Sequence, residues 1–468
     1  MIENKSKIVA VILAAGEGKR MKSKKSKVLQ QVGGKAMIDA VISAAKGAGA
    51  DEIVVVVGHM ADQVVAHVEG RATCVYQNER LGTGHAVLQA KDFFGAAPTD
   101  SAPTILVLCG DTPIITSETL KKMIESHRNE GNSGTFLTAI TDEKYAYGRI
   151  VREADGSINR IVEEVDCTSE EAAIKELNAG MYCFKGDDLL LALSQLGNNN
   201  NQGEYYLTDT LEILNRNKKR CGAYVVEHFD ETLGVNDRSN LATAESIIKK
   251  RCAEKHMANG VSIIDPANTY ISEDAVIGMD TVIYPGTIID DGVTIGEDCK
   301  IGPNSRLSST RIGDGVAVNN SIVVESEVGD NTKIGPFAYI RPGSKIGKGV
   351  KIGDFVEIKN SDIGDKCSIS HLTYVGDSDV GRNVNIGCGV VFVNYDGQKK
   401  HRSLVADNCF IGCNTNLVSP IKIGEGAYTA AGSTITEDVP AFALAIARER
   451  QTNKLDWVKS KNKVREEK

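Results

Sequence analysis

The chain has 468 residues, a mass of 50.2 kDa and a formal net charge of −8 at pH 7. Charged residues make up 25% and hydrophobic residues 41% of it, which supports two or three folded domains and excludes a disordered chain. The negative charge argues against a protein that binds nucleic acid by broad electrostatic attraction. No apolar run approaches the roughly 20 residues that span a bilayer, so we expect no membrane segment.

Eleven cysteines are scattered along the chain without a CxxC pair. This distribution predicts reduced thiols in a cytoplasmic protein rather than a disulfide framework or a structural zinc site. The apolar segment Ile8–Ala15 superficially resembles part of a signal peptide, but it is short and runs directly into Gly16-Glu17-Gly18. A buried strand that enters a glycine turn explains it better.

Residues 1–236 alternate strand patterns with helix patterns. Apolar, mostly β-branched or leucine-rich runs of strand length occur at Ile8–Ala15, Ile53–Val57 and Thr104–Leu108, and helical spacing occurs at Ile38–Ala48 and Thr83–Phe94. This alternation predicts an α/β, Rossmann-like domain with a mostly parallel sheet covered by helices on both faces. Such sheets bind ligands at the carboxyl ends of their strands.

Residues 237–258 predict one helix that links two domains. Asp237 is the expected N-cap, and Asn259-Gly260 is the expected stop.

From about residue 259 to residue 447 the pattern changes to a short repeat. An Ile-Gly or Val-Gly pair recurs fourteen times between Ile277 and Gly424, and most intervals are six, twelve or eighteen residues, or one residue short of these. A period of six fits a triangular coil in which each side points one aliphatic residue inward. A β-sandwich with glycine turns would not keep this phase. We therefore predict a left-handed parallel β-helix of hexapeptide repeats.

Two segments depart from this repeat. Residues 394–402 interrupt the phase and predict a loop that leaves the coil, the kind of excursion that often carries function. Residues 448–468 form a basic tail, for which a solvated terminus and a segment that reaches over a bound ligand are both open alternatives.

Two features of the first domain suggest phosphate chemistry. Gly16 and Gly18 follow the first strand and allow backbone N–H groups to approach a phosphate, while Lys19, Arg20 and Lys27 add positive charge. The alternative is a tight turn with incidental surface charge. Asp111 follows the strand Thr104–Leu108, at the edge where metal ions and phosphates meet.

The order of the motifs carries a family resemblance. The first half contains, in sequence, LAAGEGKRM, SKVLQ, QNERLGTGHA, CGDTP, YGRI, IVEE, NAGMY and GVNDR. This half resembles the sugar-1-phosphate nucleotidylyltransferases. The repeat half adds AYIRPG from Ala338, HLTY from His371 and NYDG from Asn394. Together the halves resemble the bifunctional enzymes that join an N-acetylglucosamine-1-phosphate uridylyltransferase to a glucosamine-1-phosphate acetyltransferase.

For the first domain, the resemblance implies uridylyl transfer from UTP to N-acetylglucosamine-1-phosphate with release of pyrophosphate. Mg²⁺ would be held by Asp111 and Asn236, and Arg20 and Lys27 would neutralise charge as the sugar phosphate attacks. The residues implied to bind the UDP-N-acetylglucosamine product are Leu13, Ala14, Ala15, Gly16, Lys27, Gln77, Gly82, Thr83, Gly148, Glu163, Asn178 and Asn236.

For the second domain, the resemblance implies acetyl transfer from acetyl-CoA to glucosamine-1-phosphate. His371 would be the general base, and Glu357 would orient its ring. The residues implied to bind glucosamine-1-phosphate are Arg341, Lys359, Tyr374 and Asn385, and those implied to bind acetyl-CoA are Cys388, Asn394, Tyr395, Cys413, Ala431 and Arg448. The resemblance also implies a homotrimer with each acetyl site between neighbouring subunits.

Three positions depart from the family pattern. Cys109 stands where the family often has Tyr, and Cys388 and Cys413 stand where it usually has Ala and Ser. The main alternative function is a monofunctional sugar-1-phosphate nucleotidylyltransferase whose β-helix is structural or regulatory. A set of ionisable groups such as Arg341, Lys359 and His371 argues against that alternative, because a structural coil would not need it.

Overall fold

The computed structural model describes residues 6–95 and 102–461, and the chain divides into two compact units, Met1–Ile248 and Lys249–Lys468. The domain boundaries 1–236 and 259–447 expected from the sequence fall within these units and stay predictions. The predicted linker helix is α7 (Arg238–Ala258), and the division falls within it. Asp237 caps α7 by accepting a hydrogen bond from Asn240 N (2.8 Å), and Gly260 follows its end with a φ of 88°.

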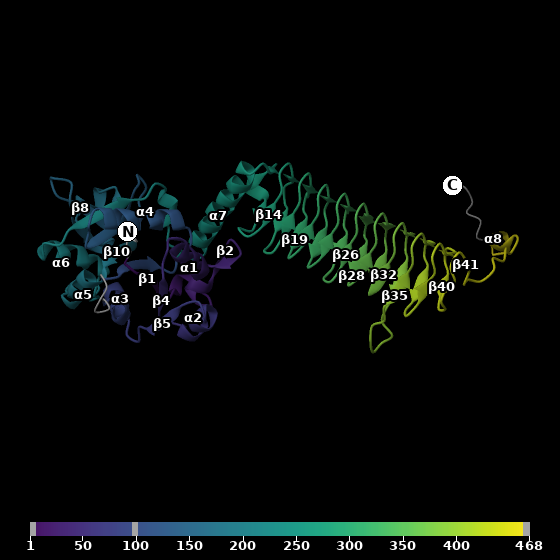
Figure 1. The fold of residues 1–468 in the computed structure, drawn as a ribbon, viewed down its shortest axis with the longest axis horizontal. Coiled ribbons are helices and arrows are strands. Elements are labelled where there is room, and N and C mark those ends of the chain that lie inside the picture. The colour runs from purple at the N-terminus through teal and green to yellow at the C-terminus, as the bar shows by residue number, and fades with distance from the viewer. Residues whose placement is uncertain (1–5, 96–101, 462–468) are drawn as a thin grey trace, which may run out of the picture. The chain divides into compact units, whose positions relative to one another are not determined.

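The first unit is built on one sheet with the strand order β11-β7-β10-β6-β1-β4-β5, to which β8 and β9 attach (Figure 1). Strands β5, β4, β1 and β6 run parallel, and β10 is antiparallel to both β6 and β7. The strands are β1 (Ile8–Ala14), β4 (Glu52–Val57), β5 (Thr73–Tyr76), β6 (Thr104–Cys109), β7 (Gly134–Ile140), β8 (Arg149–Arg152), β9 (Ile158–Val162), β10 (Glu176–Lys185) and β11 (Cys221–Val225).

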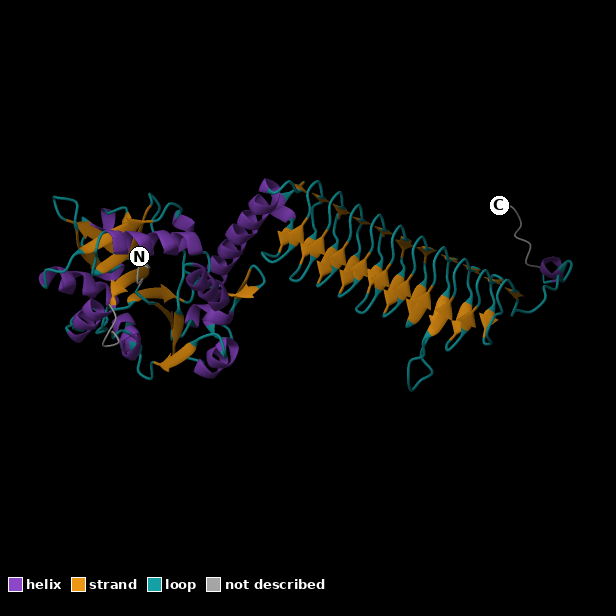
Figure 2. Cartoon of the chain, viewed as in Figure 1, coloured by secondary structure: helices purple, strands orange, loops and turns teal. Residues whose placement is uncertain are grey.

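Helices cover both faces of this sheet, as Figure 2 shows. Successive residues of β1 enter opposite cores: Ala10 and Ile12 pack in one cluster, and Val9 and Val11 in the other. A strand buried on both faces must be apolar at every position, which explains the uninterrupted run in the sequence. The helices are α1 (Met37–Gly47), α2 (Ala61–Val68), α3 (Thr83–Leu88), α4 (Ser117–Asn129), α5 (Gly186–Ser194) and α6 (Thr210–Arg216).

One predicted helix is shorter than expected. The pattern over Thr83–Phe94 predicts a continuous helix, but α3 ends at Leu88 and a separate 3₁₀ turn covers Lys91–Phe93. The Gln89 N–H bonds the carbonyls of Ala86 and Val87. The α-helix ends here because its last hydrogen bonds span fewer residues, as in a 3₁₀-helix.

The second unit is a prism of three parallel sheets that contain 11, 10 and 9 strands (Figure 2). From β12 (Ser262–Ile263) to β40 (Thr434–Ile435), each strand pairs with the third strand before or after it in the chain, and at the end of the coil β39 (Tyr428–Thr429) pairs with β41 (Leu444–Ala445). One turn of the coil therefore contributes one strand to each sheet. This confirms the predicted left-handed parallel β-helix of hexapeptide repeats.

The two-residue strands of the coil explain the six-residue repeat. In β16 (Ile288–Ile289), Ile288 points outward and is 37% exposed, whereas Ile289 points inward and is 1% exposed. Ile289 pairs in register with Leu307, which is also fully buried. One core of such aliphatic residues extends from Ala253 of α7 to Val439.

The segment 394–402 leaves the coil between β34 (Val391–Val393) and β35 (Ser403–Val405), as predicted, and protrudes from the prism (Figure 1). The described part of the tail contains the short helix α8 (Trp457–Ser460), and residues 462–468 lie outside the described range. All eleven cysteines are free thiols. Among residues 6–95 and 102–461, no helix has the length and apolar character needed to cross a membrane.

The alternation in β16 gives a stability prediction. Ile289→Ala removes buried methyl groups and should lower the free energy of unfolding by about 2–5 kcal/mol. Ile288→Ala is the matched control, because the same change at the exposed neighbour should cost under about 1 kcal/mol. Urea unfolding followed by circular dichroism measures both. Equal losses in the two variants would contradict the inward and outward assignment.

Candidate active sites

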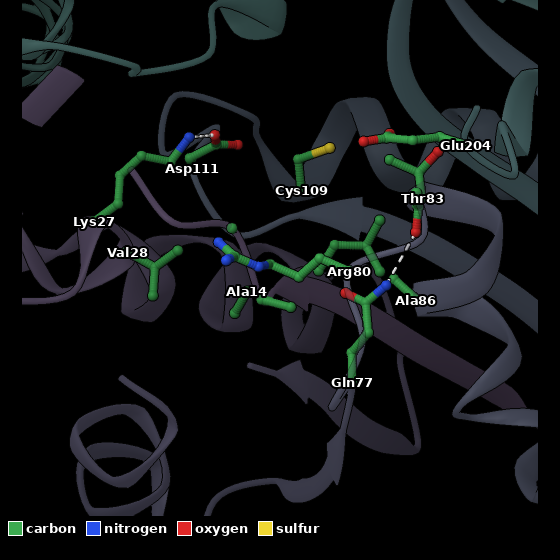
Figure 3. Close-up of a pocket in the computed structure, with 14 residues that line it drawn as sticks. Ala14, Lys27, Val28, Gln77, Arg80, Thr83, Ala86, Cys109, Asp111 and Glu204 are labelled. Carbon is green, nitrogen blue, oxygen red and sulfur yellow. Dashed lines mark hydrogen bonds and ion pairs between the residues drawn. The ribbon is translucent and has the colours of Figure 1, made fainter. Parts of the chain in front are cut away.

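A cavity of about 290 Å³ opens at the carboxyl edge of the parallel strands in the first unit. It lies against the turn that follows β1, the segment after β5 and the end of β6. Figure 3 shows the Lys27 and Asp111 side chains at one end and the Gln77 and Thr83 side chains at the other. The lining residues are Leu13, Ala14, Ala15, Gly16, Lys27, Val28, Gln77, Arg80, Gly82, Thr83, Ala86, Cys109, Asp111 and Glu204.

A second cavity of about 240 Å³ adjoins the first. Four residues line both, namely Leu13, Thr83, Cys109 and Asp111, so the two cavities are halves of one cleft. The residues that line only the second are Thr112, Ala146, Tyr147, Gly148, Glu163, Asn178, Ala179, Gly180, Tyr182, Leu207, Thr208, Thr232, Gly234 and Asn236.

Two glycines shape the first half of the cleft. Gly18 has a φ of 63°, and a Cβ there would lie 2.8 Å from Lys27 Cβ. Gly82 has a φ of 107°, and a Cβ there would lie 2.6 Å from the Tyr205 carbonyl oxygen. In both turns the conformation and the space admit only glycine. Gln77 Nε2 donates to the Gly82 carbonyl (3.0 Å), which fixes the segment after β5 at one end of this half.

The Lys27 side chain lies where the two halves of the cleft meet. Its ammonium donates to Asp111 Oδ2 and to Asn236 Oδ1, the latter at 3.0 Å. Both partners come from loops far apart in sequence, and the Lys27 and Asp111 side chains are mostly buried. A carboxylate oxygen and an amide oxygen therefore converge on one positive charge.

The second half of the cleft has a polar wall. Asn178 Nδ2 donates to Tyr182 Oη (2.9 Å), and Thr208 Oγ1 donates to Glu163 Oε1 (3.0 Å). Burial raises the pKa of Glu163 above its ordinary value, although the Thr208 hydrogen bond opposes the shift. Polar side chains at fixed positions in a small cavity suit the hydroxyl groups of a sugar.

Cys109 separates the two halves without acting as a nucleophile. Its side chain is half-buried, and the thiol donates to the Gly180 carbonyl (3.3 Å). Burial, with a further contribution from Asp111, raises the pKa of Cys109 to about 12, so the thiol stays neutral. At this position the cleft has a small apolar wall.

In the second unit, one corner of the coil forms a ladder of equivalent residues. Asp354 at the end of β27 (Lys351–Asp354) pairs in register with His371 at the end of β30 (Ser368–His371). The registers of β33 (Asn385–Ile386) and β36 (Phe410–Ile411) place Cys388 beside Cys413 on the following coils, and Ala431 comes next. Five consecutive coils thus bring these residues to one edge.

Positively charged side chains gather in the next sheet of the coil, at the ends of its strands that lie away from His371. Arg341 and Lys359 occupy adjacent coils there, because Ile340 and Ile358 pair in register. The pKa of Lys359 is lowered, first by contact with the Lys400 ammonium and then by desolvation and by Arg341. Three cations held this close suit a phosphate group.

Side chains around these cations are tied together by hydrogen bonds. Arg341 donates to Glu357 Oε1 (2.6 Å), and Asn394 Nδ2 donates to Tyr374 Oη (3.3 Å) and to Asp377 Oδ2 (2.5 Å). The base of the protruding loop is thereby fixed to the coil.

The expected partner of His371 is not the one that the structure shows. The sequence analysis gives Glu357 the role of orienting the ring, but His371 Nδ1 bonds Asp354 Oδ1 (2.7 Å) and Glu357 bonds Arg341. The reason is register: Asp354 is the direct pair of His371, whereas Glu357 pairs with Tyr374, beyond the corner.

The remaining predicted residues of the second unit lie close to this corner. Asn385 begins the strand that leads to Cys388, and Arg448 approaches Gly432, since a Cβ on Gly432 would lie 3.7 Å from Arg448 Cδ. Tyr395 is exposed on the loop and donates to the Gly397 carbonyl (2.7 Å). The surface is open: the His371 side chain is 60% exposed.

Comparison with known proteins identifies the family. The Nucleotidyl transferase family matches residues 9–231. The Bacterial transferase hexapeptide (six repeats) matches residues 325–360, and the Hexapeptide repeat of succinyl-transferase matches residues 292–326 and 405–437. The protein named Bifunctional protein GlmU from Acetivibrio thermocellus is 56% identical over 461 residues, which cover 98% of this chain and 99% of that protein.

The chain belongs to the GlmU family of bifunctional proteins. Proteins of the same name from Caldanaerobacter subterraneus and Clostridium tetani are 53% and 51% identical, each over 97% of this chain and at least 98% of their own. The protein is therefore a bifunctional enzyme with a nucleotidyltransferase domain and a hexapeptide transferase domain. The alternative of a single activity with a purely structural coil finds no support in these GlmU relatives.

Most of the predicted nucleotide and sugar residues line the cleft. This holds for all twelve residues implied to bind UDP-N-acetylglucosamine and for Asp111. Arg20 is the exception, since it lies exposed in the 3₁₀ turn Lys19–Met21 and lines neither half. Sequence reasoning missed Arg80, which lines the first half and donates to Glu17 Oε2 (2.6 Å). Arg80 belongs to the QNERLGTGHA motif, so this motif could have identified it as a residue of the site.

Proposed function

We propose that the β-helix acetylates glucosamine-1-phosphate with acetyl-CoA, and that the first unit then transfers uridylyl from UTP to N-acetylglucosamine-1-phosphate with release of pyrophosphate. Uridylyl transfer is supported by the cleft of the first unit, whose two halves meet at Asp111 and Lys27. Acetyl transfer is supported by the ladder of residues around His371 and by the cluster of cations in the same coil. The cytoplasmic location expected from the sequence stays a prediction.

For uridylyl transfer, we assign the cavity beside Gln77 and Gly82 to the nucleotide and the cavity beside Glu163 and Asn178 to the sugar. The nucleophile is the sugar phosphate, which is already anionic, so no general base is required. The residues must instead neutralise charge while pyrophosphate leaves. Lys27 lies where the two cavities meet and suits that task, and Arg20 is the second cation that the sequence analysis proposes.

Nucleotidyl transfer in this family requires a divalent metal, and we propose Mg²⁺. Asp111 and Asn236 already direct oxygens at one positive group, the Lys27 ammonium, and oxygen is the ligand that Mg²⁺ prefers. One carboxylate and one amide leave the other ligand positions to phosphate oxygens and water. When bound, the ion supplies Lewis-acid stabilisation of phosphate charge.

For acetyl transfer, the amine of glucosamine must lose a proton as it attacks the thioester carbonyl. A histidine suits this work near neutral pH, and His371 is the exposed histidine at the corner ladder. We assign the phosphate of the substrate to Arg341 and Lys359, with Lys400 beside them. Tyr374 and Asn385 complete the polar surroundings, and Cys388, Asn394, Tyr395, Cys413, Ala431 and Arg448 are assigned to acetyl-CoA.

An open surface around His371 leaves substrates exposed to water, and we propose that a homotrimer closes it. Phe337, Phe355 and Leu372 support this, because they stack on three consecutive coils at one corner with φ values of 60°, 55° and 45°. Each is more than half exposed, and the two phenyl rings stack at 5.4 Å. Bulky apolar residues are costly both in this left-handed conformation and in water. A second copy of the chain that covers them would offset the cost of exposure.

Replacement of Asp111 tests the uridylyl site. Asp111→Asn keeps the shape but removes the charge, so uridylyl transfer should fall by about 100-fold or more, while acetyl transfer stays unchanged. Pyrophosphate release and coenzyme A release measure the two reactions. Asp142→Asn is the matched control, since Asp142 forms an exposed pair with Lys175 (2.5 Å). Equal loss of both activities in a folded variant would refute the assignment.

Replacement of His371 tests the acetyl site in the opposite direction. His371→Ala should lower acetyl transfer by about 100-fold or more and leave uridylyl transfer intact. His401 is the other histidine of the β-helix half, and it bonds Asp396 within the loop (2.6 Å). If acetyl transfer survives in His371→Ala but is lost in His401→Ala, the base is misassigned.

Light scattering tests the homotrimer. The wild-type mass should be three times the chain mass of 50.2 kDa. Phe355→Asp should give a monomer that retains uridylyl transfer and loses most acetyl transfer, because only the second site is completed by a neighbour. Val276→Asp changes an equally exposed residue of β14 (Val276–Ile277) and should leave the mass unchanged. A monomeric wild type with full acetyl transfer would rule the trimer out.

A further inference from the structure

We propose that Asp354 is the positioning residue of His371, and that it fixes Nε2 as the ring atom that accepts the proton during acetyl transfer. This inference rests on the proposed role of His371 as the base and adds the group that prepares it.

The backbone places the two side chains together. Asp354 and His371 are register partners on neighbouring coils, and the Leu372 N–H donates to the Asp354 carbonyl (3.0 Å). The strands β27 and β30 are extended to four residues here, whereas most strands of the coil have two. Backbone pairing therefore continues as far as Asp354 and His371, and it fixes the Cα positions from which the carboxylate and the ring extend.

The chemistry of the contact determines the tautomer. His371 Nδ1 and Asp354 Oδ1 are 2.7 Å apart. The hydrogen bond from His371 is the main cause that lowers the pKa of Asp354, so this carboxyl is ionised near neutral pH. An ionised carboxylate can only accept, and the proton between the two groups therefore belongs to Nδ1. The neutral ring is left with its free lone pair on Nε2, at the end far from the backbone.

The other histidine of the β-helix, residues 259–447, shows the opposite arrangement. His401 uses Nε2 for its bond to Asp396 Oδ2 (2.6 Å), which leaves Nδ1 as the free atom. Its side chain is 22% exposed, against 60% for His371. Of these two rings, only that of His371 presents an unprotonated Nε2 on the open surface.

The reaction step follows from this geometry. The amine nitrogen forms a bond to the thioester carbonyl carbon and gives its proton to Nε2. The carbon–sulfur bond then breaks, coenzyme A leaves as a thiolate, and the proton passes from Nε2 to that sulfur. While the ring carries both protons, its positive charge lies beside the Asp354 carboxylate, which stabilises it. Besides Asp354, the only ionisable side chain on the described strands paired with β30 is that of Lys351, which pairs with Ser368 at the far end. Cys388 lies two residues beyond β33, on the next coil.

The test uses Asp354→Asn in the full-length protein. An amide has the same shape, but it can donate to Nδ1 and favour the wrong tautomer. We expect kcat for acetyl transfer to fall about 10- to 100-fold, the size of effect seen when a group that orients a histidine is removed. The KM for glucosamine-1-phosphate and the uridylyl transfer rate should stay within about twofold of wild type, because Asp354 is proposed to act only through the His371 ring. Asp290→Asn is the matched control, since Asp290 pairs with Arg306 on the next coil (2.7 Å), and it should change nothing.

A spectroscopic measurement separates positioning from a merely structural role. In protein labelled with ¹⁵N-histidine, the His371 ring signal is the one that disappears in His371→Ala. Wild type should show a proton on Nδ1, and Asp354→Asn should show loss of that preference. Wild-type kcat in Asp354→Asn, or an unchanged tautomer signal, would overturn the inference. If His371→Ala itself keeps full acetyl transfer, the proposed function fails instead, so the two failures are distinguishable.

Discussion

In-register pairing of parallel strands is the constraint on which both units depend. It decides which residues become neighbours when they are far apart in sequence. In the first unit, Leu13 pairs with Cys109, so the turn after β1 and the Asp111 segment after β6 leave the sheet side by side. In the second unit, Asp354 pairs with His371, and the same register continues coil after coil. Each site is thus positioned by backbone hydrogen bonds before any side-chain contact is made.

The two units use this constraint for different electrostatic tasks. The cleft of the first unit collects opposite charges, since Lys27 is shared between Asp111 and Asn236 in a mostly buried position. The edge of the second unit gathers like charges, and the lowered pKa of Lys359 reflects the repulsion from Lys400 and Arg341. In the first unit, by contrast, the Lys27 ammonium and the Asp111 carboxylate already balance each other.

The sequence predicted the architecture well because both periodicities are properties of burial. The uninterrupted apolar run of β1 follows from a strand buried on two faces, and the period of six follows from one inward residue on each side of the coil. The motif order selected residues that line one cleft. Arg20 and Arg80 show the limit of this approach, because Arg20 belongs to the motif LAAGEGKRM and Arg80 to the motif QNERLGTGHA, but only Arg80 lines the cleft. Which cation of a glycine-rich turn faces inward depends on backbone conformation that spacing does not specify.

The assignment of Glu357 as the partner of His371 shows a second limit and how to overcome it. A family resemblance indicates which type of residue to expect in the region of the site. Two residues contact each other across neighbouring coils only when they occupy the same position in the repeat. Asp354 precedes His371 by 17 residues, which is one full coil, whereas Glu357 precedes it by 14 and falls beyond the corner. The repeat interval was readable from the Ile-Gly pairs. Applying it to the polar positions would have identified Asp354 from the sequence.

The protruding loop shows how the coil accommodates function without losing this register. Ile386 and Ile411 pair although 25 residues separate them, so the extra chain at 394–402 leaves the ladder intact. The loop is closed by its own contacts, the bridge between Tyr395 and Lys400 and the bond between His401 and Asp396. Its exit is anchored by Arg402, which bonds Asp379 (2.5 Å). An insertion at a corner costs little because it replaces one exposed turn with another, whereas an insertion within a strand would shift every aliphatic residue out of the core. For this reason the coil can add extra residues such as Asn394 and Tyr395 only at its corners, and the binding roles proposed for these two residues rely on that tolerance.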